Sequence, residues 1–504
     1  MNAILSSALP TVEGPIQVFG RSKPFLSCGP ALAAAGYIEE EFFLSGQSSV
    51  YDWAAEEPGR LRCLSKPVEY KTRMLVWRPR DPRRFSGDLE LTLLNSSLGY
   101  DLGGPIDPTE MVAAGDVWIG LTTKPVSAAA LARWDHERYS SLSWPSPFDA
   151  EDRCAYPSIV PAYTFGPGSE TVIQAMSHLF STPETEDGLI WDVMNQLGLL
   201  LKGSGRDKVL PGFPCPRVFA TGFSQSSQYL RTWIAAFHDQ ARTEDGRPLY
   251  DGYLAIGGPV MARMHQCASD VTLQDPRQRL KISDARIISL SSEGEIWMAH
   301  HTRQPDEIAP ASGIVSYEVA GGSHFAAEVS SVGPSLISSQ TPPTAAMQAM
   351  PEFSLQQAAA ALLPPGTRLN DLPWKPIERG AFHNLKVWVR DGVTPPLGQP
   401  IITDCHGEIV RDVHGNALGG VRLPHIDLPL ATYRGSLSEG GLGSVIGWSR
   451  PLTPSGNPSA PSTSAKDLHV FFEAAERLHR ERWISQSDAV ALNKSVTEYT
   501  RLVP

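Results

Sequence analysis

The segment Val218–Leu230, with the sequence VFATGFSQSSQYL, most restricts how this chain can fold. Small and apolar residues lead into a Gly-Phe-Ser-Gln-Ser motif, and the residues after the motif place apolar side chains at helical spacing. This order predicts a buried strand that turns sharply into a helix, with a serine at the turn. Because so tight a turn crowds the backbone, the residues two before and two after that serine have to be small.

The size requirement selects one hydroxyl group from this segment. Four candidates lie within seven positions: Thr221, Ser224, Ser226 and Ser227. Ser224 has Gly222 two residues before it and Ser226 two residues after it, whereas each of the other serines has a glutamine at one of these positions. Ser224 is therefore the predicted nucleophile. The small residue after Ser224 is Ser226 instead of the more usual Gly. The motif alone is therefore also compatible with an ordinary polar turn that has no catalytic role.

A serine nucleophile needs a general base that is oriented by a third group. Two later segments supply candidates, since ARIISLSSEGEIW and VSYEVAGGSHF each resemble a short strand followed by a polar loop. The first carries Glu293 and Glu295 and the second carries His324. The order Ser, acid, His is that of a catalytic triad on successive strand ends. Counting from Ser292 at the strand end favours Glu295 as the acid, and Glu293 is the alternative.

The developing oxyanion of such a reaction needs two backbone N–H donors. One is expected from Gln225, directly after the nucleophile. The other is expected in the loop of LTLLNSSLGYD, from Ser96 or Ser97. An ordinary Asn/Ser/Gly turn from Asn95 to Asp101 is the alternative interpretation of that loop.

Short apolar runs that alternate with helical stretches predict an α/β fold, with a mostly parallel sheet covered by helices on both faces. The expected strands are residues 72–77, 88–95, 115–123 and 217–224 and the apolar parts of YDGYLAIGG, ARIISLSS and IVSYEV. We interpret residues 1–504 as a single domain with a β-rich N-terminal extension, 1–85. Residues 330–375 are a candidate cap or lid insertion that includes a helix in SLQQAAAALLPPG, and residues 397–464 a loop-rich excursion that precedes a closing helix.

Composition excludes several classes of partner. The chain has 504 residues, 43 of them basic and 54 acidic, and its net charge of −11 with no basic cluster argues against nucleic acid. The start of the chain lacks the features of an export leader, and no run of about 18 apolar residues predicts a membrane span. The six cysteines form no Cys-x-x-Cys pair, so we expect mostly free core thiols in a cytoplasmic, soluble protein.

No cofactor or metal site is predicted. The segment TDCHGEIVRDVHGN gathers Asp, Cys and His residues, but their spacing matches no zinc pattern and favours a turn-rich loop. The glycines of GGLGSVIG do not have the spacing of a dinucleotide-binding loop, and the chain contains no phosphate-binding G-x-x-x-x-G-K-[ST] motif.

Most of the chain resembles the α/β-hydrolase-domain family of large bacterial and fungal carboxylesterase-like proteins. The resemblance rests on segments such as AGYIEEEFFLSGQSSVYDW, TGFSQSSQYLRTW, SLSSEGEIW, YEVAGGSHF and the distinctive RDVHGNALGGVRLPHIDLPLATYRG. It implies an α/β-hydrolase fold and esterase-type activity, with Ser224 and His324 at the positions of the family's serine and histidine. The family's acidic segment matches Ser292–Glu295, with Glu295 where Asp is usual.

The residues and the resemblance together predict a serine hydrolase that cleaves a small-molecule carboxylic ester or lactone through an acyl-enzyme. An acyltransferase with the same triad is one alternative, because it differs only in the group that accepts the acyl chain. A non-catalytic ligand-binding protein on the same fold is the other. That class is expected to lack a triad member, and this sequence lacks none.

Overall fold

The computed structural model describes residues 5–6, 8–17, 23–55, 59–97, 99–154, 181–281, 284–325, 362–438, 441–452 and 465–502. The described chain divides into two compact units. Of the residues described, those up to Ala285 form the first unit and those from Arg286 onward form the second. None of the helices in these ranges is both long enough and apolar enough to cross a bilayer.

The first unit is built on a mixed sheet with the strand order β1-β2-β5-β7-β6-β8-β9. Antiparallel pairing joins β1, β2, β5 and β7, and parallel pairing joins β7, β6, β8 and β9. The strands are β1 (Thr11–Glu13), β2 (Tyr37–Ser48), β5 (Val68–Pro79), β6 (Asp88–Leu93), β7 (Val117–Leu121), β8 (Arg217–Phe223) and β9 (Gly252–Ile256). A separate two-stranded ribbon pairs β3 (Tyr51–Trp53) with β4 (Leu61–Cys63).

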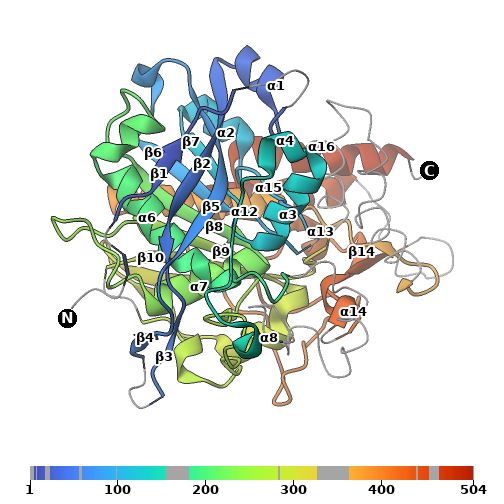
Figure 1. Ribbon diagram of the computed structural model, residues 1–504. Coiled ribbons are helices and arrows are strands. Elements are labelled where there is room, and N and C mark those ends of the chain that lie inside the picture. The colour runs from blue at the N-terminus through green and yellow to red at the C-terminus, as the bar shows by residue number, and fades with distance from the viewer. Residues whose placement is uncertain are drawn as a thin grey trace. The chain divides into compact units, whose positions relative to one another are not determined.

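Most residues of the parallel strands of this sheet are buried, and β6 differs from β7 and β9 in alternating polar and apolar side chains. Every residue of β6, β7 and β9 is buried, as expected for parallel strands enclosed on both faces. Helix α7 packs against β8 and β9, and α6 packs against β2 (Figure 1). The helices of the first unit are α1 (Gly29–Ala34), α2 (Pro108–Ala114), α3 (Pro125–Trp134), α4 (His136–Tyr139), α6 (Ile190–Lys202) and α7 (Gln225–Ala236).

The second unit contains two groups of paired strands and a group of helices. One group has the order β10-β12-β11, in which β10 (Arg286–Ser292) is parallel to β12 (Gly313–Val319) and β11 (Glu307–Ile308) is antiparallel to β12. The other is antiparallel, with the order β13-β15-β14: β13 (Arg368–Leu369), β15 (Trp448–Pro451) and β14 (Ala431–Arg434). The helices are α8 (Ile296–Thr302), α12 (Lys375–Asp391), α13 (Pro424–Asp427), α14 (Gly441–Val445), α15 (Ala465–Arg480) and α16 (Gln486–Leu502).

The predicted α/β class is confirmed, and each apolar run that predicts a strand contains one. The expected closing helix is also present as α15, which packs against α16 (Figure 1). Residues 326–361, which include most of the candidate cap and its predicted helix, lie outside the described residues. The domain boundaries at 1–85, 330–375 and 397–464 stay predictions.

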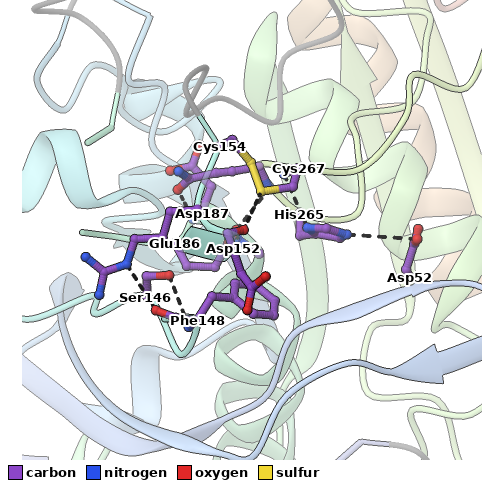
Figure 2. Close-up of a disulfide and its surroundings, with 12 residues drawn as sticks. Asp52, Ser146, Phe148, Asp152, Cys154, Glu186, Asp187, His265 and Cys267 are labelled. Carbon is purple, nitrogen blue, oxygen red and sulfur yellow. Dashed lines mark hydrogen bonds and ion pairs between the residues drawn. A yellow bond between two sulfur atoms is a disulfide. The ribbon is translucent and has the colours of Figure 1, made fainter. Parts of the chain in front are cut away.

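The prediction that the cysteines are mostly free is confirmed, since four of the six are free thiols, but the prediction that they are core residues is wrong and one disulfide was not predicted. Cys154 and Cys267 form a disulfide across a sequence separation of 113 residues, between segments of the first unit that lie beside Asp152, Glu186 and Asp187 (Figure 2). Among the free thiols, Cys63, Cys215 and Cys405 are exposed, so they are not core residues. The spacing of the cysteines could not reveal this pair, because its partners meet only through the tertiary fold.

The disulfide is expected to stabilise the protein by restricting the unfolded chain. A loop of 113 residues is long, and closing such a loop typically adds about 2–4 kcal/mol to the free energy of unfolding. Replacing both Cys154 and Cys267 by Ser should therefore lower the midpoint of urea unfolding, whereas replacing the exposed Cys215 by Ser should not. Equal midpoints for the double variant and the unmodified protein under oxidising conditions would contradict this expectation.

A buried carboxyl group lies next to the disulfide. Glu186 is 1% exposed, and its Oε1 accepts hydrogen bonds from the amides of Gly188 at 2.8 Å and Gln266 at 3.1 Å. The neighbouring Asp187 forms an ion pair with the buried Lys124, at 3.1 Å. Burial, helped by the charge of Asp187 and opposed by the two amides, raises the pKa of Glu186 to about 8. The Glu186 carboxyl therefore holds a proton in the neutral range.

This protonation makes folding stability depend on pH. The folded protein keeps the Glu186 proton up to about pH 8, whereas the ordinary pKa of this side chain is 4.5, so folding takes up a proton between these values. The free energy of unfolding should therefore fall as pH rises through this window, by about 1 kcal/mol per pH unit. Glu186→Gln removes the titrating group. The free energy of unfolding, measured with urea from about pH 5 to about pH 8, should decline more steeply with pH for the unmodified protein than for this variant. Parallel curves would contradict the raised pKa of Glu186.

Candidate active site

Ser224 lies at the junction of β8 and α7, in a backbone conformation that few residues adopt. Its φ is 59° and its ψ is −119°. Among the described residues other than glycine, only Leu26 and Arg482 also have a positive φ. Such a conformation costs on the order of 1–3 kcal/mol and persists where the surrounding structure holds it. Here the Ser224 N–H donates to the carbonyl of Ile256 at 2.7 Å, and its own carbonyl accepts from Gln228 N–H at 3.2 Å.

Two glycines leave room for this turn. A Cβ atom on Gly222 would lie 2.7 Å from the carbonyl carbon and oxygen of Ser226. A Cβ atom on Gly258, which follows β9, would lie 2.3 Å from the carbonyl oxygen of Ser224. Both distances are far below van der Waals contact, so the backbone of the turn occupies the space that a side chain would need. This crowding accounts for the small residues on both sides of Ser224.

Gln225, from which the first oxyanion donor is predicted, directly follows Ser224. Gln225 is the first residue of α7, so its N–H has no acceptor within the helix. The helix N-terminus also carries a partial positive charge, which favours a developing negative charge nearby.

A second polar segment of the first unit follows β6, the neighbour of β8. In the parallel register Leu93 is opposite Gly222, so Asn95 follows at the level of Ser224. The Nδ2 of Asn95 donates to the carbonyl oxygen of Phe223, at 2.8 Å. Residues 95–97 and 99–102, which we name the Asn95 loop, therefore connect directly to the residue before the predicted nucleophile. In the sequence Asn95 is recognisable only as part of a possible turn, because its contact with Phe223 arises from the pairing of β6 with β8.

In the second unit His324 contacts Glu295. The His324 Nδ1 lies 2.6 Å from Glu295 Oε1, and both side chains are largely buried. Glu295 Oε2 accepts from the amide of Ser292 at 2.5 Å, and the Ser292 hydroxyl accepts from Gly294 N–H at 3.2 Å. These reciprocal bonds form a capping box at the end of β10 and fix the Glu295 carboxylate.

Glu293, the alternative acid, has different partners. Its Oε2 accepts from the amide of Gly321 at 2.7 Å, and its Oε1 accepts from Gly435 N–H at 3.2 Å. The guanidinium group of Arg411 also lies 2.9 Å from Glu293 Oε1. Glu293 is thus occupied in holding three segments of the second unit together, and the carboxylate that meets His324 is that of Glu295.

The structure thus brings the candidate residues together in two groups. In the first unit Ser224, Gln225 and Ser96 belong to the adjacent ends of β8 and β6. In the second unit Glu295 and His324 follow the adjacent parallel strands β10 and β12.

The candidate metal-ligand segment forms turns. Asp404 Oδ1 accepts from the amides of His406 and Glu408 at 2.8 and 3.0 Å, and Asp412 Oδ1 accepts from two amides in the next turn. This confirms the turn-rich interpretation of TDCHGEIVRDVHGN.

A separate group of side chains in the described part of the chain brings three potential metal-ligand atoms within 4.8 Å of one another: His238, Asp239 and Asp284. Arg242 forms an ion pair with Asp284 at 2.5 Å, and His238 lies 2.8 Å from the same carboxylate. Arg242 also lies 3.6 Å from Asp239, so both carboxylates of the cluster already pair with a guanidinium group and do not form a free carboxylate pair for a cation.

Comparison with known proteins places the chain in a family. A model of the family described as alpha/beta hydrolase domain matches residues 12–494. The chain belongs to the alpha/beta hydrolase family. This membership agrees with the resemblance drawn from the sequence segments and with the strand–serine–helix turn of the first unit. No match was found among the curated proteins compared.

Several solved structures of esterases share weak similarity with this chain. Acetyl xylan esterase 1 from Thermoanaerobacterium sp. is 9% identical with a TM-score of 0.29, covering 62% of this chain and 82% of its own. A lipase/esterase from Lactobacillus plantarum is 11% identical with a TM-score of 0.24, covering 49% and 79%. A bacterial esterase is 11% identical with a TM-score of 0.23, covering 55% and 85%. Similarity at this level carries no argument about substrate or mechanism.

Proposed function

We propose that this alpha/beta hydrolase is a serine hydrolase that cleaves a carboxylic ester or lactone of a small molecule through an acyl-enzyme intermediate. The observation that carries the proposal is the backbone of Ser224, with φ 59° at a strand–helix junction. A positive-φ serine carries a conformational cost, and strained residues of this kind are concentrated at active sites, where a serine on a strand–helix turn is the arrangement of a nucleophile.

In the proposed mechanism Ser224 Oγ attacks the carbonyl carbon of the substrate, while His324 takes the hydroxyl proton. The contact between His324 Nδ1 and Glu295 supports a tautomer that carries its proton on Nδ1, with Nε2 as the base. The carboxylate of Glu295 then stabilises the imidazolium that forms. His324 returns the proton to the leaving alcohol, and a water molecule hydrolyses the acyl-enzyme by the same steps.

The negative charge on the carbonyl oxygen is proposed to be stabilised by two backbone N–H groups. One is that of Gln225 at the N-terminus of α7, and the other is in the Asn95 loop, where Ser96 is the candidate. Donors that are fixed before the reaction begins are effective because they need no reorganisation as the charge develops.

The proposal is tested by labelling with a fluorophosphonate probe, which forms a covalent bond with activated serines. We expect a single labelled peptide that contains Ser224. Ser224→Ala should abolish labelling, whereas Ser226→Ala, which keeps a small residue at that place, should retain it. Absence of labelling in the unmodified protein would argue for a non-catalytic binding protein.

Product analysis separates hydrolysis from acyl transfer. A hydrolase is expected to convert p-nitrophenyl esters or lactones to free acids, whether or not an alcohol is added. Formation of a new ester as the main product when an alcohol is supplied would favour the acyltransferase alternative, because both reactions pass through the same acyl-enzyme.

A further inference from the structure

We infer that Asn95 is a positioning residue that sets the second oxyanion donor, the Ser96 N–H, relative to the nucleophile. This inference rests on the proposed function. Asn95 is 8% exposed and follows β6, next to the end of β8. Its side chain makes two hydrogen bonds of different kinds, and each has a separate consequence for the loop.

The first bond ties the loop to the nucleophile. Asn95 Nδ2 donates to the carbonyl oxygen of Phe223 at 2.8 Å, and Phe223 directly precedes Ser224. A shift of the loop relative to the Ser224 turn would therefore break this bond. This bond is partly buried, so breaking it would leave a carbonyl with reduced access to water, and that penalty favours one arrangement of the two segments.

The second bond decides which amide of the loop remains for a ligand. The Ser97 N–H donates to Asn95 Oδ1 at 2.7 Å, so it is already used inside the loop. The hydrogen bonds among the described residues engage the Ser96 carbonyl, through Gly99 N–H, and the Ser96 hydroxyl, through Ser127, but not the Ser96 N–H. The choice between Ser96 and Ser97 thus falls on Ser96.

The far end of the loop is anchored as well. Asn95 and Leu102 pair through both backbone hydrogen bonds, at 2.9 and 2.8 Å. Asp101, which is fully buried, accepts from the Thr122 hydroxyl at 2.5 Å and lies 3.5 Å from the buried guanidinium of Arg73. With Asp101 fixed to the sheet and Asn95 fixed to the β8–α7 junction, the Ser96 amide between them has little freedom to move.

Two variants test this role. Asn95→Ala removes both side-chain bonds, whereas Asn95→Asp keeps an acceptor for Ser97 N–H but cannot donate to Phe223. If the tether positions the donor, both variants should lower kcat by about 10- to 100-fold and change KM by less than about threefold. The inhibition constant of a trifluoromethyl ketone, which forms a tetrahedral oxyanion on Ser224, should rise by the same factor as kcat falls.

Asn384→Asp is the matched control. Asn384 is 1% exposed, and its Nδ2 donates to the carbonyl of Arg482 at 2.7 Å in the second unit. The control should lower the melting temperature, as we also expect for the Asn95 variants, but leave kcat and the inhibition constant unchanged. If Asn95→Ala fails to fold, Asn95→Asp alone decides.

The outcomes separate this inference from the proposed function. Suppose that the unmodified protein is labelled by the fluorophosphonate and hydrolyses substrate, and that Asn95→Asp keeps kcat and the inhibition constant within about twofold of the unmodified values. This result would overturn the positioning role and leave the assignment as a serine hydrolase intact. A lower melting temperature with unchanged kinetics would also overturn it, because Asn95 would then be structural only. An unmodified protein that is not labelled would overturn the proposed function and the positioning role with it.

Discussion

Replacing Ser224 by Ala is expected to lower kcat/KM for the best ester or lactone substrate by about 10⁴- to 10⁶-fold, because the reaction then has no nucleophile to acylate. The activity that remains should be direct attack of water on the bound substrate, assisted only by the two N–H donors that stabilise the oxyanion. Initial rates over a panel of p-nitrophenyl esters and lactones, measured at enzyme concentrations high enough to detect slow turnover, would give this ratio.

The positive φ of Ser224 adds a second expectation for the same protein. Alanine has the same preference against this conformation as serine, so Ser224→Ala should not gain stability by relieving the backbone. Ser224→Gly, by contrast, accepts a positive φ readily and should be more stable than Ser224→Ala, by up to about 1 kcal/mol. Near-normal hydrolysis by either variant would refute the assignment of Ser224.

The two neighbouring glutamates should respond to the same substitution in different ways. Glu295→Gln replaces the carboxylate that contacts His324 at 2.6 Å with a neutral amide of the same shape. The imidazolium that forms during the reaction then loses its stabilising charge, and the amide can favour the wrong tautomer. We expect kcat to fall by about 10²- to 10⁴-fold with a small change in KM.

Glu293→Gln is the matched control for that variant. Glu293 is as buried as Glu295, but it contacts Arg411 and two backbone amides. Removing its charge leaves Arg411 without this partner, so unfolding by urea should require less denaturant while kcat of the folded enzyme is affected much less. If Glu293→Gln loses activity and Glu295→Gln keeps it, the proposed acid is wrong.

The sequence predicts the β8–α7 turn well because the constraint there is local. The requirement for small residues around Ser224 depends only on neighbours in the chain, and Gly222 meets the backbone of Ser226 as that requirement implies. The strands are predictable for a similar reason, since β7 and β9 are continuous apolar runs and β6 alternates polar and apolar residues along its length.

Other features depend on tertiary contacts that the sequence does not display. Glu293 and Glu295 both lie at the end of β10, and only their partners, Arg411 and His324, distinguish them. Likewise, the tether from Asn95 to Phe223 requires β6 and β8 to be neighbours in a known register, which spacing along the chain does not reveal. The antiparallel pairing of β2 with β5 depends on the path of the connecting loops in the same way.

The position of the disulfide has a consequence for the integrity of the chain. The covalent ring closed by Cys154 and Cys267 contains the whole of β8, Ser224 and α7. A protease that cuts once anywhere inside this ring leaves both fragments joined, and the serine turn stays attached to the protein on either side of the cut. Such a nicked molecule would migrate as one species on a non-reducing gel and as two after reduction.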